Sequence, residues 1–158
     1  MTKSGVGRPW DGKFLGFRMT ANGRIAAAKA SLDKLKQRVR RAWDAQVSQP
    51  LEQRIEHWQR YIRGLWNDFK PCEYRQPIFA LEGWSGKHMR KYFWQRWHNR
   101  KGRQNALRRL KAKPYHQKQA SGTVGAWRMA RSPMLQTVLD NARLRRWGLY
   151  VPSDFATA

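Results

Sequence analysis

The chain has 158 residues, with 33 lysines and arginines against 10 acidic residues, and its formal net charge at pH 7 is +23. This excess is far from that of an ordinary soluble enzyme and indicates an anionic partner, with nucleic acid favoured over a membrane surface. No apolar run approaches the roughly 20 residues that span a bilayer, and the N-terminus lacks a signal-peptide core. We therefore expect a cytoplasmic protein with no membrane partner.

Disorder is the main alternative for so basic a chain, but the aromatic content argues against it. Nine tryptophans and an aromatic share of 13% supply enough apolar surface for the core of about one domain. The single cysteine, Cys72, can form no internal disulfide and has no neighbouring ligands for a metal. We expect a folded domain that holds no metal and no cofactor.

The N-terminal part predicts a small hairpin. Residues 1–12 form a polar, glycine-rich lead-in, and residues 13–19 (KFLGFRM) are apolar and aromatic. Asn22 and Gly23 follow as a tight-turn dipeptide, so residues 24–28 are predicted to return as a second strand. The alanines of the second segment equally allow the start of a helix.

The next segment, residues 31–46, predicts an amphipathic helix. Ser31 is a suitable N-cap for it. Its predicted inward stripe consists of Leu32, Leu35, Val39 and Ala42 or Trp43, and Lys34, Arg38 and Arg41 face away.

Residues 51–70 form the most regular segment of the chain, bounded by Pro50 and Pro71. The apolar stripe recurs at spacings of three and four and consists of Leu51, Ile55, Trp58, Ile62, Leu65 and Phe69. The opposite side carries Arg54, Arg60, Arg63 and Asn67, with Tyr61 and Trp66 at its borders. We predict a helix with one buried face and one basic face.

The C-terminal half is predicted to be less regular. Residues 77–97 form an amphipathic segment in which Gly83 and Gly86 predict a kink or two pieces. Residues 111–125 are predicted to be a loop, and residues 133–147 a last helix that ends at Gly148. The tail after Pro152 is expected to be loose.

Aromatic residues on helical stripes normally face the core, so Trp58, Trp66 and Trp84 are interpreted as core residues rather than surfaces for base stacking. The sequence leaves open whether Tyr92, Trp94 and Trp97 face inward. Cys72 is interpreted as inert, and His57 and His88 as ordinary polar groups.

No acidic residue occurs between Glu82 and Asp140, whereas lysines and arginines are frequent there. Such charges have no local partners and are expected to contact phosphates. The candidate RNA-binding residues are Arg60, Arg63, Lys87, Arg90, Lys91, Arg96, Arg100, Lys101 and Arg103. Their replacement is expected to weaken binding without lowering the melting temperature.

Several motifs occur in an order that resembles one family. These are FLGF at residues 14–17, SLDKLKQRVR, IRGLWNDF, LEGWSGKHMRKYFWQRW and GAWRMARSPMLQTVLDNARLRRWGL. Together they resemble the C-terminal part of group II intron-encoded reverse transcriptase/maturases, over nearly the whole chain. The resemblance implies a mainly α fold, a thumb-like helical bundle with a small N-terminal β-hairpin. It also implies three regions: an end-of-palm-like lead-in at 1–30, maturase-specific (domain X) helices at 31–97 and a basic nucleic-acid-binding region at 98–158.

In that family the catalytic carboxylate pair lies in a palm motif upstream of FLGF. No two acidic residues are adjacent in this sequence, so we assign no catalytic residue and expect no enzyme activity from the chain on its own. The implied function is an RNA-binding maturase domain that assists group II intron folding and splicing. The implied partners are group II intron RNA or other structured RNA, with DNA and a separate palm chain as further candidates. Two alternatives stay open, a non-specific nucleic-acid-binding structural protein and the thumb-side subunit of a split reverse transcriptase.

Overall fold

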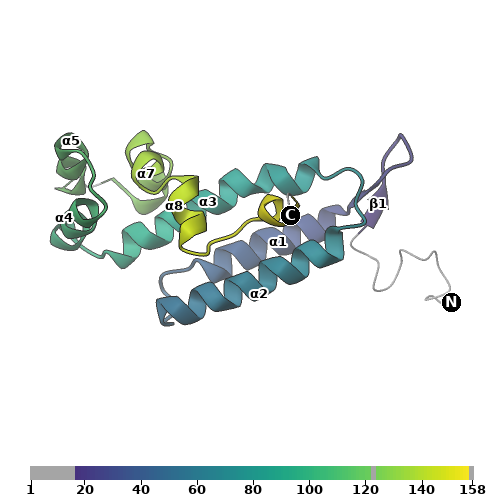
Figure 1. Ribbon diagram of the computed structural model, residues 1–158, viewed down its shortest axis with the longest axis horizontal. Helices are drawn as coiled ribbons and strands as arrows, with labels where there is room; N and C mark the ends of the chain where they lie inside the picture. Colours follow the sequence, from purple (N-terminus) through teal and green to yellow (C-terminus); the bar gives the residue numbers. More distant parts are fainter. Residues whose placement is uncertain (1–16, 122–123, 157–158) are drawn as a thin grey trace.

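The computed structural model describes residues 17–121 and 124–156 (Figure 1). The chain is 68% helical with one two-stranded sheet in the described part, which confirms the predicted mainly α fold with a small N-terminal hairpin. Residues 1–16, to which the sequence assigned the lead-in and the start of the first strand, lie outside the described residues.

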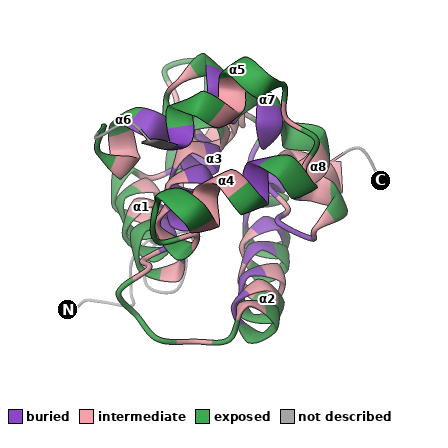
Figure 2. Ribbon diagram, turned by 90° about the vertical axis from the view of Figure 1, so that its left-hand side faces the viewer, coloured by how far each residue is buried: buried purple, intermediate pink, exposed green. Residues whose placement is uncertain are grey.

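Three long helices form a bundle: α1 (Lys29–Ala42), α2 (Leu51–Phe69) and α3 (Gln76–Arg96). They lie side by side along the long axis of the molecule (Figure 1). Their inward stripes meet in one large apolar core that includes Leu35, Val39, Trp58, Ile62 and Met89, and the buried residues of α2 lie on the side that it turns toward the other helices (Figure 2). The apolar periodicity of α1 and α2 therefore produces the packing that it predicted.

The predicted hairpin is confirmed in its described part. Strand β1 (Phe17–Met19) pairs antiparallel with β2 (Ile25–Ala27), with Phe17 opposite Ala27. Gly23 in the turn has a φ of +77°, a left-handed conformation that glycine adopts without steric cost. The Phe17 ring meets Phe69 of α2 edge-on at 5.9 Å between centroids, so the bundle supplies the surface on which the hairpin packs.

The two ends of α1 differ from the prediction. The helix begins at Lys29 with Ala28 at the N-cap position, so Ser31 lies inside it and is not its cap. It ends at Ala42 rather than at residue 46. Arg54 stabilises this end, because its guanidinium donates to the carbonyl oxygen of Ala42, which the helix leaves unpaired, and to that of Val47 in the following loop.

The prediction that Arg54 faces outward is therefore wrong. The residue is only 3% exposed, and its guanidinium lies 4.6 Å from the centroid of the Tyr92 ring on α3. Carbonyl oxygens and an aromatic face surround the charge in place of water. Elsewhere on α2, Trp58, Ile62 and Phe69 are buried and Arg60 and Arg63 are exposed, as predicted. The other members of the predicted stripe are only partly buried against the core: Leu51, Ile55 and Leu65.

Helix α3 runs through Gly83 and Gly86 as one continuous element, so of the two predicted alternatives, a kink or two pieces, the second is wrong. At its C-terminal end the chain turns into a set of short helices that we call the terminal lobe. The lobe consists of α4 (Arg100–Arg109), α5 (Pro114–Gln117), η2 (Lys118–Ser121), α6 (Ala126–Ala130) and α7 (Pro133–Val138). It lies at the end of the molecule away from the hairpin (Figure 1).

Two further predictions in this region are corrected. Residues 111–125 are not all loop, because Pro114 stands at the start of α5, where its missing N–H has no cost. The predicted single helix over 133–147 is divided into α7 and α8 (Asn141–Arg146). The division falls at Asp140, whose carboxylate accepts a hydrogen bond of 2.8 Å from the Arg143 N–H and caps the new helix.

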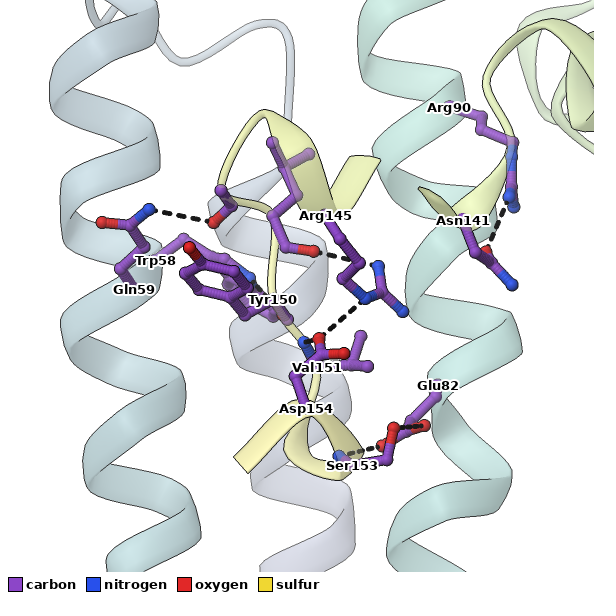
Figure 3. Close-up of polar contacts among 12 residues, drawn as sticks. Trp58, Gln59, Glu82, Arg90, Asn141, Arg145, Tyr150, Val151, Ser153 and Asp154 are labelled. Atoms are coloured by element: carbon purple, nitrogen blue, oxygen red, sulfur yellow. Dashed lines mark hydrogen bonds and ion pairs between the residues drawn. The ribbon is translucent and has the colours of Figure 1, made fainter. Parts of the chain in front are cut away.

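The described part of the tail, up to residue 156, forms a helix that packs on the bundle, contrary to the prediction. Residues 148–156, which we call the C-terminal strap, return along the groove between α2 and α3 and end in α9 (Pro152–Ala156) (Figure 3). Trp58 Nε1 donates to the Tyr150 carbonyl at 2.8 Å, and Gln59 donates to the Gly148 carbonyl at 3.2 Å. The strap thus covers one side of the bundle, and α1 lies on the other (Figure 3).

Candidate nucleic-acid interface

The nine predicted contact residues come from three helices and differ sharply in exposure. Arg60 and Arg63 lie on α2, and Arg96 at the end of α3 precedes Arg100 and Lys101 on α4; all five are exposed. Lys87, Lys91 and Arg103 are half-buried, and Arg90 is buried. Exposed residues can contact a phosphate, whereas a buried one contributes to the stability of the fold.

Arg90 belongs to the second group. It is 6% exposed, and its Nε donates to the Leu139 carbonyl at 2.6 Å. Its Nη2 donates to Asn141 Oδ1 at 3.0 Å (Figure 3). Burial is also the main cause that lowers the pKa of this guanidinium. Arg90 therefore joins α3 to the start of α8, and we remove it from the candidate surface.

Arg103 is also committed to an intramolecular contact. Its guanidinium lies 4.6 Å from the centroid of the Trp94 ring, and its Nε donates to the Trp94 carbonyl at 3.0 Å. These contacts join the first turn of α4 to the last turns of α3. Its position supports that of its exposed neighbours Arg100 and Lys101.

Arg96, Arg100 and Lys101 form the exposed cationic corner between α3 and α4, which we call the α3/α4 corner. The turn between the helices is fixed by Asn99, whose side chain accepts a hydrogen bond of 2.9 Å from the Gly102 N–H. No acidic residue lies between Glu82 and Asp140, so no carboxylate from this region neutralises the corner. This corner is the strongest of the predicted contact regions.

Lys87 and Lys91, one turn apart on α3, belong to a second basic region, separate from the α3/α4 corner. Here the His88 ring lies between Trp84, at 4.4 Å, and Trp127 of α6, at 4.7 Å between centroids. Burial, with Lys91 and Arg40 nearby, lowers the pKa of His88 to about 4. The histidine is therefore neutral at pH 7 and packs as an aromatic group.

Arg60 and Arg63 lie at a third place, on the outer face of α2. Arg60 pairs with Glu56 at 2.5 Å, and both side chains are largely exposed, so the pair adds little to stability. The Arg63 guanidinium lies 6.0 Å from the centroid of the Phe155 ring in the strap. The structure thus distributes the predicted residues over three regions of the surface.

One basic region was missed by the sequence analysis as a site. An open groove of about 340 Å³ lies along α1. It is lined by Lys34, Gln37, Arg38 and Arg41 of α1 and by Tyr61 of α2. Burial raises the pKa of Tyr61 to about 12, an effect that Arg38 partly opposes. The available signal was the spacing of the three cations by four and three residues, which places them on one face of the helix.

The remaining sequence interpretations can now be placed. Trp58 and Trp66 are 2% and 3% exposed, which confirms them as core residues, whereas Trp84 is only partly buried at the edge of the core. Cys72 is buried, and burial raises its pKa to about 11, so its thiolate form is disfavoured at neutral pH. Within residues 17–121 and 124–156, no group of three His, Cys, Asp or Glu side chains could hold a metal ion. None of the helices described there is both long and apolar enough to cross a membrane.

The fold and the surface charge define the class of protein: a basic, mainly helical domain with exposed cations at several places on a bundle of three helices. Comparison with protein families then gives the particular family. Residues 32–111 match the family described as the group II intron, maturase-specific domain. The matched segment covers half of the chain and runs from α1 through the end of α4, so the chain belongs to this family. No curated protein matches the chain.

Proposed function

We propose that this domain binds the folded RNA of a group II intron and assists its folding and splicing, with no bond-breaking step of its own. Family membership supports a maturase role. The observation that carries the proposal is the α3/α4 corner, where Arg96, Arg100 and Lys101 are exposed on an ordered turn inside the acid-free stretch. Cations in a fixed arrangement neutralise phosphates that approach one another when RNA helices pack.

The half-buried lysines of α3 and the exposed arginines of α2 extend this surface in the proposal. Arg60 and Arg63 are exposed, and Lys87 and Lys91 are half-buried. Long basic side chains can keep the charged group in water when only their stems are covered. The groove on α1 adds Lys34, Arg38 and Arg41. Cations on several helices fit a large folded RNA better than a single extended strand.

The test compares binding to intron RNA with binding to random RNA and duplex DNA over a salt series. Arg96→Ala, Arg100→Ala and Lys101→Ala are each expected to cost up to about 1 kcal/mol of binding free energy and to reduce the salt slope by nearly one unit. The melting temperature should stay unchanged, because these side chains are exposed.

The matched controls are Arg18→Ala and Lys29→Ala, which remove the same charge from exposed positions at the hairpin end of the molecule. Equal losses from both sets of variants would mean that only total charge matters, as in a packaging protein. Equal affinity for intron RNA, random RNA and duplex DNA would contradict the proposal in the same way. Splicing of a group II intron RNA, followed with and without the protein, tests the second half of the proposal.

A further inference from the structure

An open groove of about 800 Å³ lies where the start of α2, the end of α3, the outer side of α4 and the end of α8 meet. Its volume is in the range of roughly 300–1,000 Å³ that is usual for ligand sites. Ile55, Trp97 and Trp147 supply apolar walls, and Arg96, Asn105 and Arg109 supply polar groups. We call it the α2/α4 groove.

The two tryptophans of the groove wall are fixed by contacts with other aromatic rings. Trp147 meets Phe93 edge-on at 5.1 Å, and Trp97 meets the buried Trp94 edge-on at 6.0 Å between centroids. Both Trp97 and Trp147 are only partly buried, and both line the groove. Indole surfaces that are fixed and partly accessible are suited to stacking against a nucleobase.

The groove depends on a close approach between α3 and α4. A Cβ atom at Gly102 would lie 2.1 Å from the Trp97 carbonyl oxygen, so only glycine allows α4 to begin this close to the end of α3. The same close packing brings Asn105 and Arg109, one and two turns further along α4, to the groove. The sequence therefore builds the groove from a local feature of the turn.

The polar side of the groove is cationic. Arg96 and Arg109 are exposed, and in the described part of the chain neither is joined to a carboxylate. None of the residues lining the groove is acidic. Asn105 adds an amide that can both donate to and accept from a base edge. Aromatic walls with a cationic border match a nucleotide, which has a flat base and an anionic phosphate.

We propose that the α2/α4 groove takes an unpaired nucleotide of the bound RNA, with its base against Trp97 or Trp147 and its flanking phosphates on Arg96 and Arg109. The proposal rests on the proposed function, because it assumes that the domain binds RNA. It adds a preference that surface charge alone does not give, since bases inside an uninterrupted duplex cannot offer their faces to an indole.

The test uses the full chain and two RNA probes, a fully paired hairpin stem and the same stem with one unpaired uridine. Arg109→Ala is expected to weaken binding of the RNA with the unpaired uridine by about fivefold more than binding of the paired stem. The matched control is Arg108→Ala, which removes the same charge from an exposed position on α4 that does not line the groove. Arg108→Ala is expected to affect both RNAs equally.

Equal effects of the two variants on both RNAs would overturn the groove as a nucleotide site while leaving RNA binding intact. Failure of the parent chain to bind a group II intron RNA, measured beside these two probes, would instead overturn the proposed function, and this inference with it. The two failures are therefore distinguishable.

Photo-crosslinking of the parent chain gives a second measurement that needs no substitution in the aromatic walls. With 4-thiouridine at the unpaired position, the crosslink is expected in the tryptic peptide of residues 97–100 or in the peptide that begins at Trp147. Crosslinks confined to other peptides would overturn the proposal.

Discussion

Ser153 in α9 donates two hydrogen bonds to Glu82 in α3, one from its backbone N–H at 2.7 Å and one from its hydroxyl at 2.8 Å (Figure 3). The next residue, Asp154, forms an ion pair of 2.7 Å with Arg145. Burial raises the pKa of Glu82, and the bonds from Ser153 oppose that effect. These contacts anchor the end of the strap to the bundle.

Ser153→Ala is expected to lower the free energy of unfolding by about 1 kcal/mol, because it removes one of the two donors to a half-buried carboxylate. Urea unfolding measures this loss. Ser48→Ala, at an exposed position in the loop between α1 and α2, is the control and should change little. A Ser153→Ala chain as stable as the parent would mean that the hydroxyl bond contributes nothing to holding the strap.

Arg90→Ala is expected to destabilise the fold by about 2–4 kcal/mol, because it leaves the Leu139 carbonyl and the Asn141 side chain without their donor and empties a buried site. Arg96→Ala, which removes the same charge from an exposed position of α3, should leave the melting temperature unchanged. Thermal unfolding of both variants checks the contrast. A normal melting temperature for Arg90→Ala would return this residue to the candidate surface.

The contrast between Arg90 and Arg96 shows where the sequence alone is insufficient. Both are arginines of α3 in the acid-free stretch, and their charge could be read from the chain. Arg90 is buried against residues 139–141, which lie almost fifty positions away, whereas Arg96 is exposed. Arg54 is a similar case, because its burial depends on the carbonyl groups that the end of α1 presents to it.

Local patterns predicted most of the bundle. The spacing of Trp58, Ile62 and Phe69 and the prolines on either side fixed α2 to within one residue at its end. The division between α7 and α8 also had a local signal in Asp140, but the apolar period on either side of it favoured one longer helix. The C-terminal strap had no local signal in the sequence, because the residues that bind it, Trp58 and Glu82, lie on α2 and α3.

Asp140→Ala is expected to cost about 1 kcal/mol of stability, because the N-terminal turn of α8 loses the carboxylate that accepts from the Arg143 N–H. Asp140→Asn should retain nearly all of the stability, since asparagine caps a helix about as well as aspartate. Urea unfolding of both variants is the measurement. An equal loss in both would assign the effect to charge rather than to capping.

The candidate site was predictable in its charge and not in its shape. The absence of acidic residues between Glu82 and Asp140 selected candidate cations from the sequence, among them Arg96, Arg100 and Lys101 of the α3/α4 corner. The α2/α4 groove combines residues of α2, α3, α4 and the end of α8, which only the packing of the helices brings together. Trp97, whose orientation the sequence left open, is partly buried and lines that groove.

His88 makes the stability of the domain depend on pH. Its ring lies between Trp84 of α3 and Trp127 of α6, with Arg40 of α1 and Lys91 close enough to oppose a further positive charge. The pKa of this histidine is lowered from its ordinary value of 6.5 to about 4. Between these two values the unfolded chain binds a proton that the folded chain does not bind.

The free energy of unfolding is therefore expected to fall as the pH drops from about 6.5 to about 4, by about 2 kcal/mol after allowance for solvent screening. His88→Phe keeps an aromatic ring between the two tryptophans and removes the titrating group, so its unfolding free energy should depend less on pH across this interval. Glu82, whose raised pKa acts in the opposite direction, is present in both chains and cancels in the comparison. Urea unfolding of parent and variant at a series of pH values measures the difference, and parallel curves would show that His88 has an ordinary pKa in the folded domain.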